Sequence, residues 1–414
     1  MRFRLASPAD YPAGLNLPWA TPLAEWPLTL FVDVERGLHR NLVRFVEHDG
    51  TLYAIKELLE HVTAREYALL RSLRELDLPV VEPIGLVTDR PATPGSQDRR
   101  GLLVTRFLPH SMPYRHVIAG GTSEAHAGQL LDALAELLVS LHLAGFYWGD
   151  CSLSNALYRL DAGRYRAYLV DAETGEIHPT LSAGQRAHDL QIAEENVAGE
   201  FMDIAAGFGL PASLDPAALA AGLVARYERL WVELTREETF AAHEQYRVDA
   251  RIARLNQLGF DVAELDLRSI EGGQQVRLRV QVVEPGHHRH RLEALTGLDV
   301  QENQARRLLN DLEHHRAVWS GMDSRRLGER EAAHRWLERV YRPAVAAIPA
   351  DERGKLEDAE IFHQLLEHRW YLSEGQGRDV PMSEVIVAYA RDVLAPLPES
   401  PGREVAVTNR ETSK

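Results

Sequence analysis

The sequence predicts an α+β protein with a small antiparallel β lobe, an α-rich lobe and an additional α-rich C-terminal domain containing a β-hairpin. Three observations indicate this class. Short runs rich in β-branched and aromatic residues fill positions 28–110. Apolar residues at helical spacing dominate positions 123–208. Beyond about position 222, longer helical patterns surround one pair of strand-like runs.

The first 27 residues are predicted to form an irregular N-terminal extension. They contain five prolines, which disfavour regular structure. We expect Trp19 and Trp26 to hold the extension against a neighbouring element through aromatic contacts.

The β lobe is predicted over residues 28–110. Asp49-Gly50 predicts a tight hairpin between its second and third strands. A helical pattern over residues 63–76 follows the third strand and ends at Asp77-Leu78-Pro79. The five strands are expected at residues 28–35, 42–48, 51–58, 80–88 and 101–108.

The α-rich lobe is predicted over residues 111–221. Ser123 is expected to cap a helix that runs to about residue 144. Two short runs, 156–160 and 165–170, predict a hairpin that delivers Asp171 at its far end. Helical patterns resume over residues 182–208.

The C-terminal domain is predicted over residues 222–396, and its sequence alone indicates no chemistry. A strand pair is expected at 262–270 and 274–283, with its turn at Gly272-Gly273. Residues 397–414 have the composition of a disordered tail. The helices of the domain are expected at 222–258, 299–319, 326–346, 355–372 and 381–395.

The composition is that of an ordinary globular protein, with 45% hydrophobic and 26% charged residues in a chain of 414. No apolar stretch is long enough to span a bilayer, and the first residues lack the apolar run of a signal peptide, so we expect a cytoplasmic protein. The net charge of −15 argues against a nucleic-acid partner. Cys151 is the single cysteine, which excludes an internal disulfide.

Lys56 is the only lysine in the first 354 residues, although the chain has 46 basic residues. Arginine occupies almost every other basic position, so a retained lysine suggests a site that needs a compact ammonium. Lys56 ends the strand-like run Tyr53-Ala54-Ile55-Lys56, where its ammonium could hold a phosphate. Chance retention is the alternative.

Four more polar residues follow Lys56 in an informative order: Glu66, Asp150, Asn155 and Asp171. Phosphoryl transfer needs a cation on the nucleotide phosphates, an acid that positions this cation, a carboxylate that orients the attacking hydroxyl, and Mg²⁺ ligands. Each residue alone could instead cap a turn or lie on a solvated surface. Their order, and the element type on which each falls, favour the catalytic interpretation.

Residues 28–210 resemble the protein-kinase-like superfamily, and most closely its atypical branches such as lipopolysaccharide (Kdo-type) kinases and RIO-type kinases. The motifs that carry the resemblance are Tyr53-Ala54-Ile55-Lys56, Arg65-Glu66, Gly149-Asp150-Cys151-Ser152-Leu153-Ser154-Asn155 and Val170-Asp171-Ala172-Glu173. The resemblance implies a two-lobed kinase-like fold with ATP and Mg²⁺ as cofactors.

The resemblance also implies a role for each matched residue. Lys56 and Glu66 would pair and hold the nucleotide phosphates. Asp150 would orient the acceptor hydroxyl, and Asn155 and Asp171 would bind Mg²⁺. The catalytic set is therefore Asp150, Lys56 and Glu66, and the metal ligands are Asn155 and Asp171.

Two further segments are implied to bind the nucleotide. The backbone of the linking segment 103–109 would contact adenine, with Thr105 and Phe107 as the expected positions. In the first hairpin turn Gly37 is the single glycine, and Arg36 and Arg40 would compensate with charge. Trp148 stands where most relatives have histidine, so the packing beneath the catalytic loop is expected to differ.

The sequence predicts an ATP-dependent phosphotransferase that acts on a hydroxyl of a small-molecule, sugar or lipid-linked acceptor. A nucleotide-binding pseudokinase or regulatory protein is an alternative, as is AMP transfer on the same fold. The acceptor and the oligomeric state stay open, because fold does not fix substrate.

Three other features have competing interpretations. Arg186 and Asp189 resemble a kinase motif that braces the catalytic loop, although a surface ion pair is the alternative. Cys151 is expected to be a small apolar residue and not a redox group. The histidines of 287–290 are expected in a solvated loop or anion-binding patch more than in a metal site.

Overall fold

The structure is a computed structural model, and the chain divides into two compact units. The first unit contains residues 1–159 and 166–285, and the second contains residues 160–165 and 286–414. The described residues are 1–5, 17–34, 41–91, 98–119, 124–207, 211, 214–236, 238–241, 264–270, 275–281, 286–323, 325 and 327–397.

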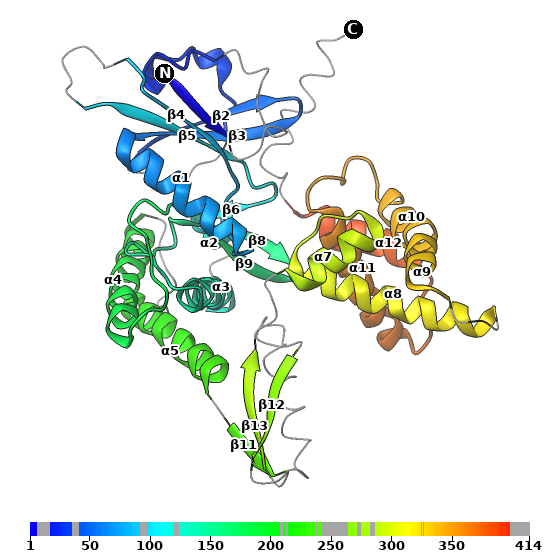
Figure 1. The fold of residues 1–414 in the computed structure, drawn as a ribbon. Coiled ribbons are helices and arrows are strands. Elements are labelled where there is room, and N and C mark those ends of the chain that lie inside the picture. The colour runs from blue at the N-terminus through cyan, green and yellow to red at the C-terminus, as the bar shows by residue number, and fades with distance from the viewer. Residues whose placement is uncertain are drawn as a thin grey trace. The chain divides into compact units, whose positions relative to one another are not determined.

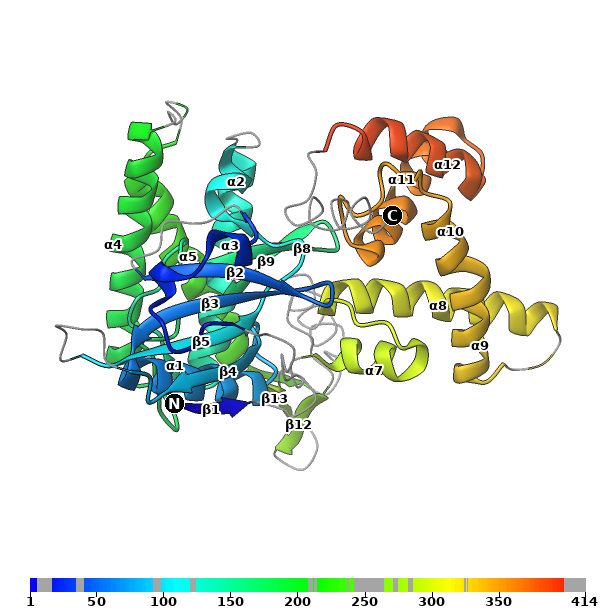
Figure 2. The same ribbon diagram turned by 90° about the horizontal axis from the view of Figure 1, so that it is seen from above.

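A five-stranded antiparallel sheet forms the β lobe of the first unit. Its strands lie in the order β1-β4-β5-β3-β2, which Figure 2 shows from above. Helix α1 (Glu60–Glu75) packs on one face of the sheet through its buried apolar side (Figure 1). The strands are β1 (Arg2–Leu5), β2 (Leu42–His48), β3 (Thr51–Leu59), β4 (Pro83–Thr88) and β5 (Arg100–Arg106).

The predicted strand at 28–35 is wrong. Its first residues form a short 3-10 helix (Leu28–Leu30), and only Val32 makes an isolated bridge, to Phe45 of β2. Pro27 immediately precedes this helix with φ near −55°, a value that suits a helical start. The fifth strand is instead β1, which the proline-rich composition of the extension concealed.

The extension is anchored to the β lobe by aromatic side chains and by one buried arginine. Trp19 meets Trp26 edge to face, with ring centroids 5.6 Å apart, and Trp26 in turn packs in the core of the β lobe. Arg90 is buried, and its guanidinium donates to the carbonyl oxygens of Trp19 and Thr21 and to the carboxylate of Glu57. These contacts satisfy the arginine's charge where water cannot reach it.

Helices dominate the second lobe of the first unit, as predicted. Helix α3 buries the leucines of one broad face, which include Leu130, Leu134 and Leu138. The lobe consists of β6 (Met112–Pro113), α2 (Tyr114–Ala119), α3 (Glu124–Leu143), β7 (Phe146–Tyr147), β8 (Ala156–Asp161), β9 (Arg164–Leu169), β10 (Glu176–Ile177), α4 (Ala183–Gly207) and α5 (Pro216–Thr235). Ser123, the predicted cap of α3, lies outside the described residues.

The boundary between the observed units lies at 285/286, whereas the sequence suggested 221/222. Helix α5 accounts for much of the difference, because it packs against α3 and α4 within the first unit. The helix predicted over 222–258 is also too long, since α5 ends at Thr235 and strand β11 (Glu238–Ala241) follows. Residues 242–258 lie outside the described residues.

The predicted strand pair is present as β12 (Glu264–Ile270) and β13 (Gln275–Gln281). It belongs to a three-stranded sheet of order β11-β13-β12, so the sequence missed one strand. The predicted turn at Gly272-Gly273 falls outside the described residues.

Helices make up most of the second unit, and they gather in one cluster (Figure 1). Their shared core includes Trp336, Phe362 and Leu312. The elements are α7 (His287–Thr296), α8 (Glu302–Met322), α9 (Glu329–Trp336), the π-helical turn Leu337–Tyr341, α10 (Arg342–Ala346), α11 (Asp358–Gln376), α12 (Met382–Tyr389) and the π-helical turn Ala390–Leu394. Most of the predicted tail, 398–414, lies outside the described residues.

No helix among the described residues is both long and apolar enough to cross a membrane.

Candidate active site

Lys56 lies among three carboxylates contributed by both lobes of the first unit. Its ammonium donates to both oxygens of Glu66 on α1, at 3.1 Å each. It also donates to Asp171 at 2.7 Å, just beyond the end of β9. A carboxylate oxygen of Glu173 lies 3.6 Å from the same nitrogen. The structure thus brings together Lys56, Glu66 and Asp171, which the sequence singled out from three separate segments.

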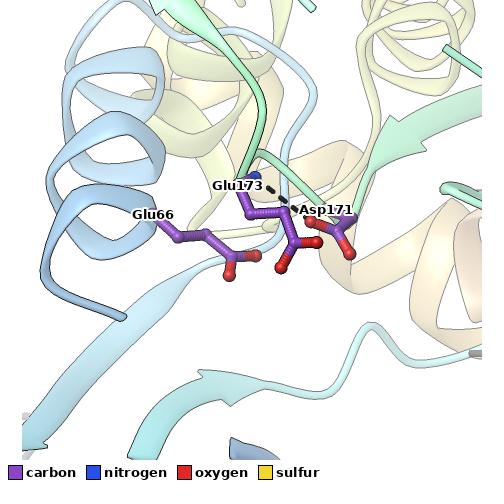
Figure 3. Close-up of side chains that lie close together, drawn as sticks. All are labelled: Glu66, Asp171 and Glu173. Atoms are coloured by element: carbon purple, nitrogen blue, oxygen red, sulfur yellow. Dashed lines mark hydrogen bonds between the residues drawn. The ribbon is translucent and has the colours of Figure 1, made fainter. Parts of the chain in front are cut away.

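Glu173 joins this cluster, although the sequence assigned it no role. Figure 3 shows its carboxylate between those of Glu66 and Asp171. Its backbone N–H donates to Asp171 at 3.1 Å, and the side-chain amide of Asn41 donates to its carboxylate at 3.1 Å. Each of the three acids offers an oxygen within 4.8 Å of the others. One ammonium faces three carboxylates, so the cluster favours a further cation.

Burial and charge shift the pKa values of the central pair. Burial raises the pKa of Glu66 to about 8, although the positive charge of Lys56 opposes this rise. Burial alone would lower the pKa of Lys56, but the charges of Glu66 and Asp171 outweigh it and the pKa is raised. Lys56 is therefore a stable cation at neutral pH, and Glu66 is the group whose charge responds to a nearby ion.

Asp150 and Asn155, which lie in the predicted catalytic loop (residues 149–155), contact each other. The side-chain amide of Asn155 donates to Asp150 Oδ2 at 3.0 Å and to the Asp150 carbonyl oxygen at 2.9 Å. The carbonyl oxygen of Asn155 accepts a hydrogen bond from the backbone N–H of Val170 at 3.1 Å. Val170 directly precedes Asp171, so this bond fixes the loop beside the chain that carries the predicted metal ligand.

Asn196, on α4, holds the other oxygen of Asp150. Its side-chain amide donates to Asp150 Oδ1 at 3.1 Å and to the carbonyl oxygen of Cys151 at 3.1 Å. Asp150 therefore has an amide donor on each carboxylate oxygen. The two donors restrict the rotation of the carboxylate and fix its orientation.

Asp189 braces the catalytic loop from beneath, as the resemblance implied. Its fully buried carboxylate accepts hydrogen bonds from the backbone N–H groups of Trp148 and Gly149, at 2.7 and 2.8 Å. It also lies 3.0 Å from His142. Arg186 does not share this role, because its guanidinium stacks on the Trp231 ring at 4.1 Å.

Trp148 links the segment of Asp150 to that of Asp171. The indole N–H donates to the carbonyl oxygen of Asp171 at 3.0 Å, and the side chain is fully buried. On the other side, Thr174 donates to the carbonyl oxygen of Trp148 at 2.8 Å. The tryptophan therefore connects the two segments that carry predicted site residues.

Glu200 completes the support of the loop from α4. Its carboxylate accepts from the backbone N–H groups of Leu153 and Ser154, at 2.8 and 2.9 Å. Burial raises the pKa of Glu200, and the hydrogen bonds from Ser154 and Leu153 oppose this rise. Beside it, burial raises the pKa of the Cys151 thiol well above its usual value, so this cysteine is an inert packing group, as predicted.

The sequence carried a signal for these supporting residues. Asp189, Asn196 and Glu200 are spaced by seven and four residues, and therefore share one face of the predicted helix over 182–208. The same helix buries Ala193, Val197 and other apolar residues around them. Polar residues on a buried helix face indicate a fixed polar partner.

The donor set fits a magnesium ion. Carboxylate and amide oxygens are the ligands that this hard cation prefers. Asp171 offers a carboxylate, and Glu173 and Glu66 add two more within 4.8 Å. In Asn155 the amide nitrogen is already bonded to Asp150, so the side-chain oxygen is the atom left for a cation.

The two positions expected to contact adenine, Thr105 and Phe107, both have backbone partners within the β lobe. Thr105 lies on β5 and pairs with Ala54 of β3. The backbone N–H of Phe107 donates to the carbonyl oxygen of Leu52 at 2.9 Å, so that amide is already committed. The expected phosphate contacts from Arg36, Gly37 and Arg40 lie outside the described residues.

The histidine-rich segment begins helix α7 and is not a loop. His288 lies 3.0 Å from Glu302, and His290 lies 3.3 Å from the guanidinium of Arg289. In the part of the chain that the structure describes, Glu66, Asp171 and Glu173 are the one group arranged to hold a metal. The histidines in the described chain therefore form no comparable group.

Comparison with known proteins gives two separate matches along the chain. Residues 40–198 match the model of the Lipopolysaccharide kinase (Kdo/WaaP) family. Residues 229–394 match a Domain of unknown function (DUF4032). No curated protein matches the sequence.

One similar solved structure is titled "WaaP in complex with acyl carrier protein". The similarity covers 62% of this chain and 99% of that chain, with 16% sequence identity and a TM-score of 0.36. The family match confirms the resemblance predicted from Lys56, Glu66, Asp150, Asn155 and Asp171: residues 40–198 are similar to the lipopolysaccharide kinase (Kdo/WaaP) family, and residues 229–394, called the DUF4032 region below, are similar to the domain of unknown function.

Proposed function

We propose that the protein is an ATP- and Mg²⁺-dependent phosphotransferase that phosphorylates a hydroxyl of a small-molecule, sugar or lipid-linked acceptor. The observation that carries this proposal is the contact of Lys56 with both Glu66 and Asp171, at 3.1 and 2.7 Å. Phosphoryl transfer requires this cation to be held beside a metal-binding carboxylate.

Each residue has a defined task in this reaction. Glu66 holds the ammonium of Lys56, which is positioned for the nucleotide phosphates. Asp150 accepts a hydrogen bond from the acceptor hydroxyl and takes its proton as the oxygen attacks the γ-phosphorus. The bond from the γ-phosphorus to the bridging oxygen of ADP breaks, and the phosphate ester and ADP are the products.

Asp171 and Asn155 are the residues that would hold Mg²⁺, and Glu173 lies next to Asp171. The metal would neutralise charge on the phosphate oxygens. The ammonium of Lys56 lies 2.7 Å from Asp171, so this carboxylate would face both the lysine and the metal.

The decisive variant is Asp171→Asn. We expect ATP-dependent turnover to fall by about 1,000-fold or more, because the substitution removes a negative charge needed by the metal. Asp203→Asn is the matched control, since Asp203 is exposed on α4. The measurement is ATP consumption with a metabolite pool as acceptor. Full turnover by Asp171→Asn would overturn the proposal.

The acceptor can be found with the same preparation. A metabolite-pool phosphorylation screen compares the wild type with Asp150→Asn, and mass spectrometry identifies the modified product. A mass gain of a phosphate supports the proposal. A gain of AMP would assign the other transfer reaction to the same fold, and binding of Mg-ATP without any product would indicate a regulatory nucleotide-binding protein.

A further inference from the structure

The turn of the β8–β9 hairpin belongs to the second unit, although both flanking stretches of chain belong to the first. Ala162 and Gly163 occupy this turn with φ values of 54° and 76°. Positive φ at both central residues is typical of a tight hairpin turn. Glycine adopts it freely, whereas alanine is strained there. The conformation of Ala162 therefore needs support from its surroundings.

Glu360 of α11 supplies this support. One carboxylate oxygen accepts from the backbone N–H of Ala162 at 2.8 Å, and the other from Gly163 at 2.9 Å. The side chain is 1% exposed. Gln304 and Gln364 donate to the same carboxylate at 3.0 and 2.9 Å, so its orientation is fixed. A buried acid with four donors is a constructed binding group for this turn.

Asp161 makes the reciprocal contact from the turn. Its carboxylate, 1% exposed, accepts from the backbone N–H groups of Asn303 and Gln304 in the first turn of α8, at 3.2 and 2.8 Å. A carboxylate at this position also interacts favourably with the helix dipole. Gln301 and Gln304 in turn donate to the carbonyl oxygen of Leu160. The turn is therefore held by the N-terminal ends of two helices of the DUF4032 region.

The opposite end of the same hairpin carries the proposed metal ligands. Strand β8 begins at Ala156, directly after Asn155, and β9 ends at Leu169, two residues before Asp171. The bond between the Val170 N–H and the Asn155 carbonyl oxygen closes this end. Strands β8 and β9 are hydrogen-bonded neighbours in one sheet, so they connect the turn directly to the segments that carry the two ligands.

We propose that Glu360 and Asp161 are positioning residues for the metal pair Asn155 and Asp171, so that the DUF4032 region acts as a support of the phosphotransfer site. The inference rests on the proposed function for the identity of the metal pair. It assigns to this region the control of magnesium affinity through the conformation of one hairpin turn.

The test compares Glu360→Gln with Glu374→Gln, an exposed position on the same helix. In Glu360→Gln, the backbone N–H of either Ala162 or Gly163 faces an amide NH₂ group in place of a carboxylate oxygen. Isothermal titration of MgCl₂ into protein saturated with a non-hydrolysable ATP analogue should give a dissociation constant about 10-fold higher for Glu360→Gln, the lower limit for outer-sphere support of a metal. Binding of the analogue in EDTA should not change.

Hydrogen exchange gives a readout independent of any metal. If the turn controls the far end of the hairpin, the Val170 amide should exchange faster in Glu360→Gln than in the control. Should Glu360→Gln fail to fold, Glu360→Asp keeps the charge and shortens the reach by one methylene, and the same measurements apply.

The outcomes separate the two proposals. Wild-type protein that binds no Mg²⁺ with the analogue overturns both the proposed function and this inference. Wild-type magnesium affinity and Val170 exchange in Glu360→Gln, together with a lower melting temperature, overturn the inference alone. That result would make the turn a structural part of the second unit only.

Discussion

The two lysines of the described chain occupy contrasting sites, one in each unit. Lys56 faces the three carboxylates of Glu66, Asp171 and Glu173. Lys355 instead donates to the carbonyl oxygens of Leu394 and Ala395, at 3.0 and 3.3 Å, and pairs with one acid. The two side chains are similarly shielded from solvent, at 13% and 7% exposed, so burial alone does not distinguish them.

The difference lies in the charge around each ammonium. Lys355 balances one carboxylate, Glu352, and the partial negative charge at a helix end, so its site is complete without any ligand. Lys56 leaves negative charge in excess, and such a site favours a divalent cation. A retained lysine in this arginine-rich chain therefore indicates a compact site, while the surrounding acids decide whether the site is structural or functional.

Replacing each lysine by arginine tests most directly whether the two lysine sites differ in function. Lys56→Arg should lower ATP turnover by about 100- to 1,000-fold, nearly as much as Lys56→Ala, because a planar guanidinium cannot fit among three carboxylates and still reach the phosphates. Lys355→Arg should keep full activity. Steady-state assays of both variants measure the effect. Normal turnover by Lys56→Arg would mean that the scarcity of lysine is composition alone.

A smaller effect is expected at the donor that orients Asp150. Asn196→Asp places a second carboxylate about one hydrogen-bond length from Asp150, in place of an amide. We expect kcat to fall by about 10- to 100-fold with little change in KM for ATP, because the nucleotide contacts stay intact.

Gln191→Glu makes the same chemical change at an exposed position of α4 and serves as the control. If KM for ATP rises as much as kcat falls, or if kcat falls equally in Gln191→Glu, Asn196 acts on folding and not on Asp150.

The smallest effect concerns the pH dependence of stability. Burial raises the pKa of Glu66 from 4.5 to about 8, so between these values the folded protein holds a proton that the unfolded chain has released. The free energy of unfolding should therefore decrease as pH rises through this window, by at most about 1.4 kcal/mol per pH unit from this group.

Denaturant unfolding of the wild type and of Glu66→Gln, at several pH values from 5 to 9, measures this contribution. The variant should have a flatter profile, because glutamine has no proton to lose. Identical slopes for the two proteins would place the proton elsewhere in the cluster.

The order of the catalytic motifs was readable from the sequence because each motif depends on local structure. Lys56 ends a strand with a clear hairpin signal, and Glu66 lies in a helix marked by apolar spacing. Hairpin patterning likewise predicted that Asp171 follows a strand end. Periodicity and turn chemistry act over a few residues, so the sequence displays them directly.

Local signals failed where longer-range competition decided the structure. The run at 28–35 has strand-like composition, yet β1 occupies a sheet edge beside β4. Edge strands are short and weakly patterned, so their pairing depends on which segments the folded chain brings together. The boundary between the compact units differs from the predicted domain boundary for a similar reason, because α5 packs against α3 and α4.

The sequence by itself indicated a β lobe and an α-rich lobe, and it singled out Lys56, Glu66, Asp150, Asn155 and Asp171 as a predicted set. Only the tertiary structure decided that Glu173 enters the carboxylate cluster and that Asn196 and Glu200 hold the catalytic loop. It also decided that Glu360 binds a turn 198 residues away in the chain. Hydrogen bonds between distant residues require fixed positions and directions, and these exist only once the core has packed.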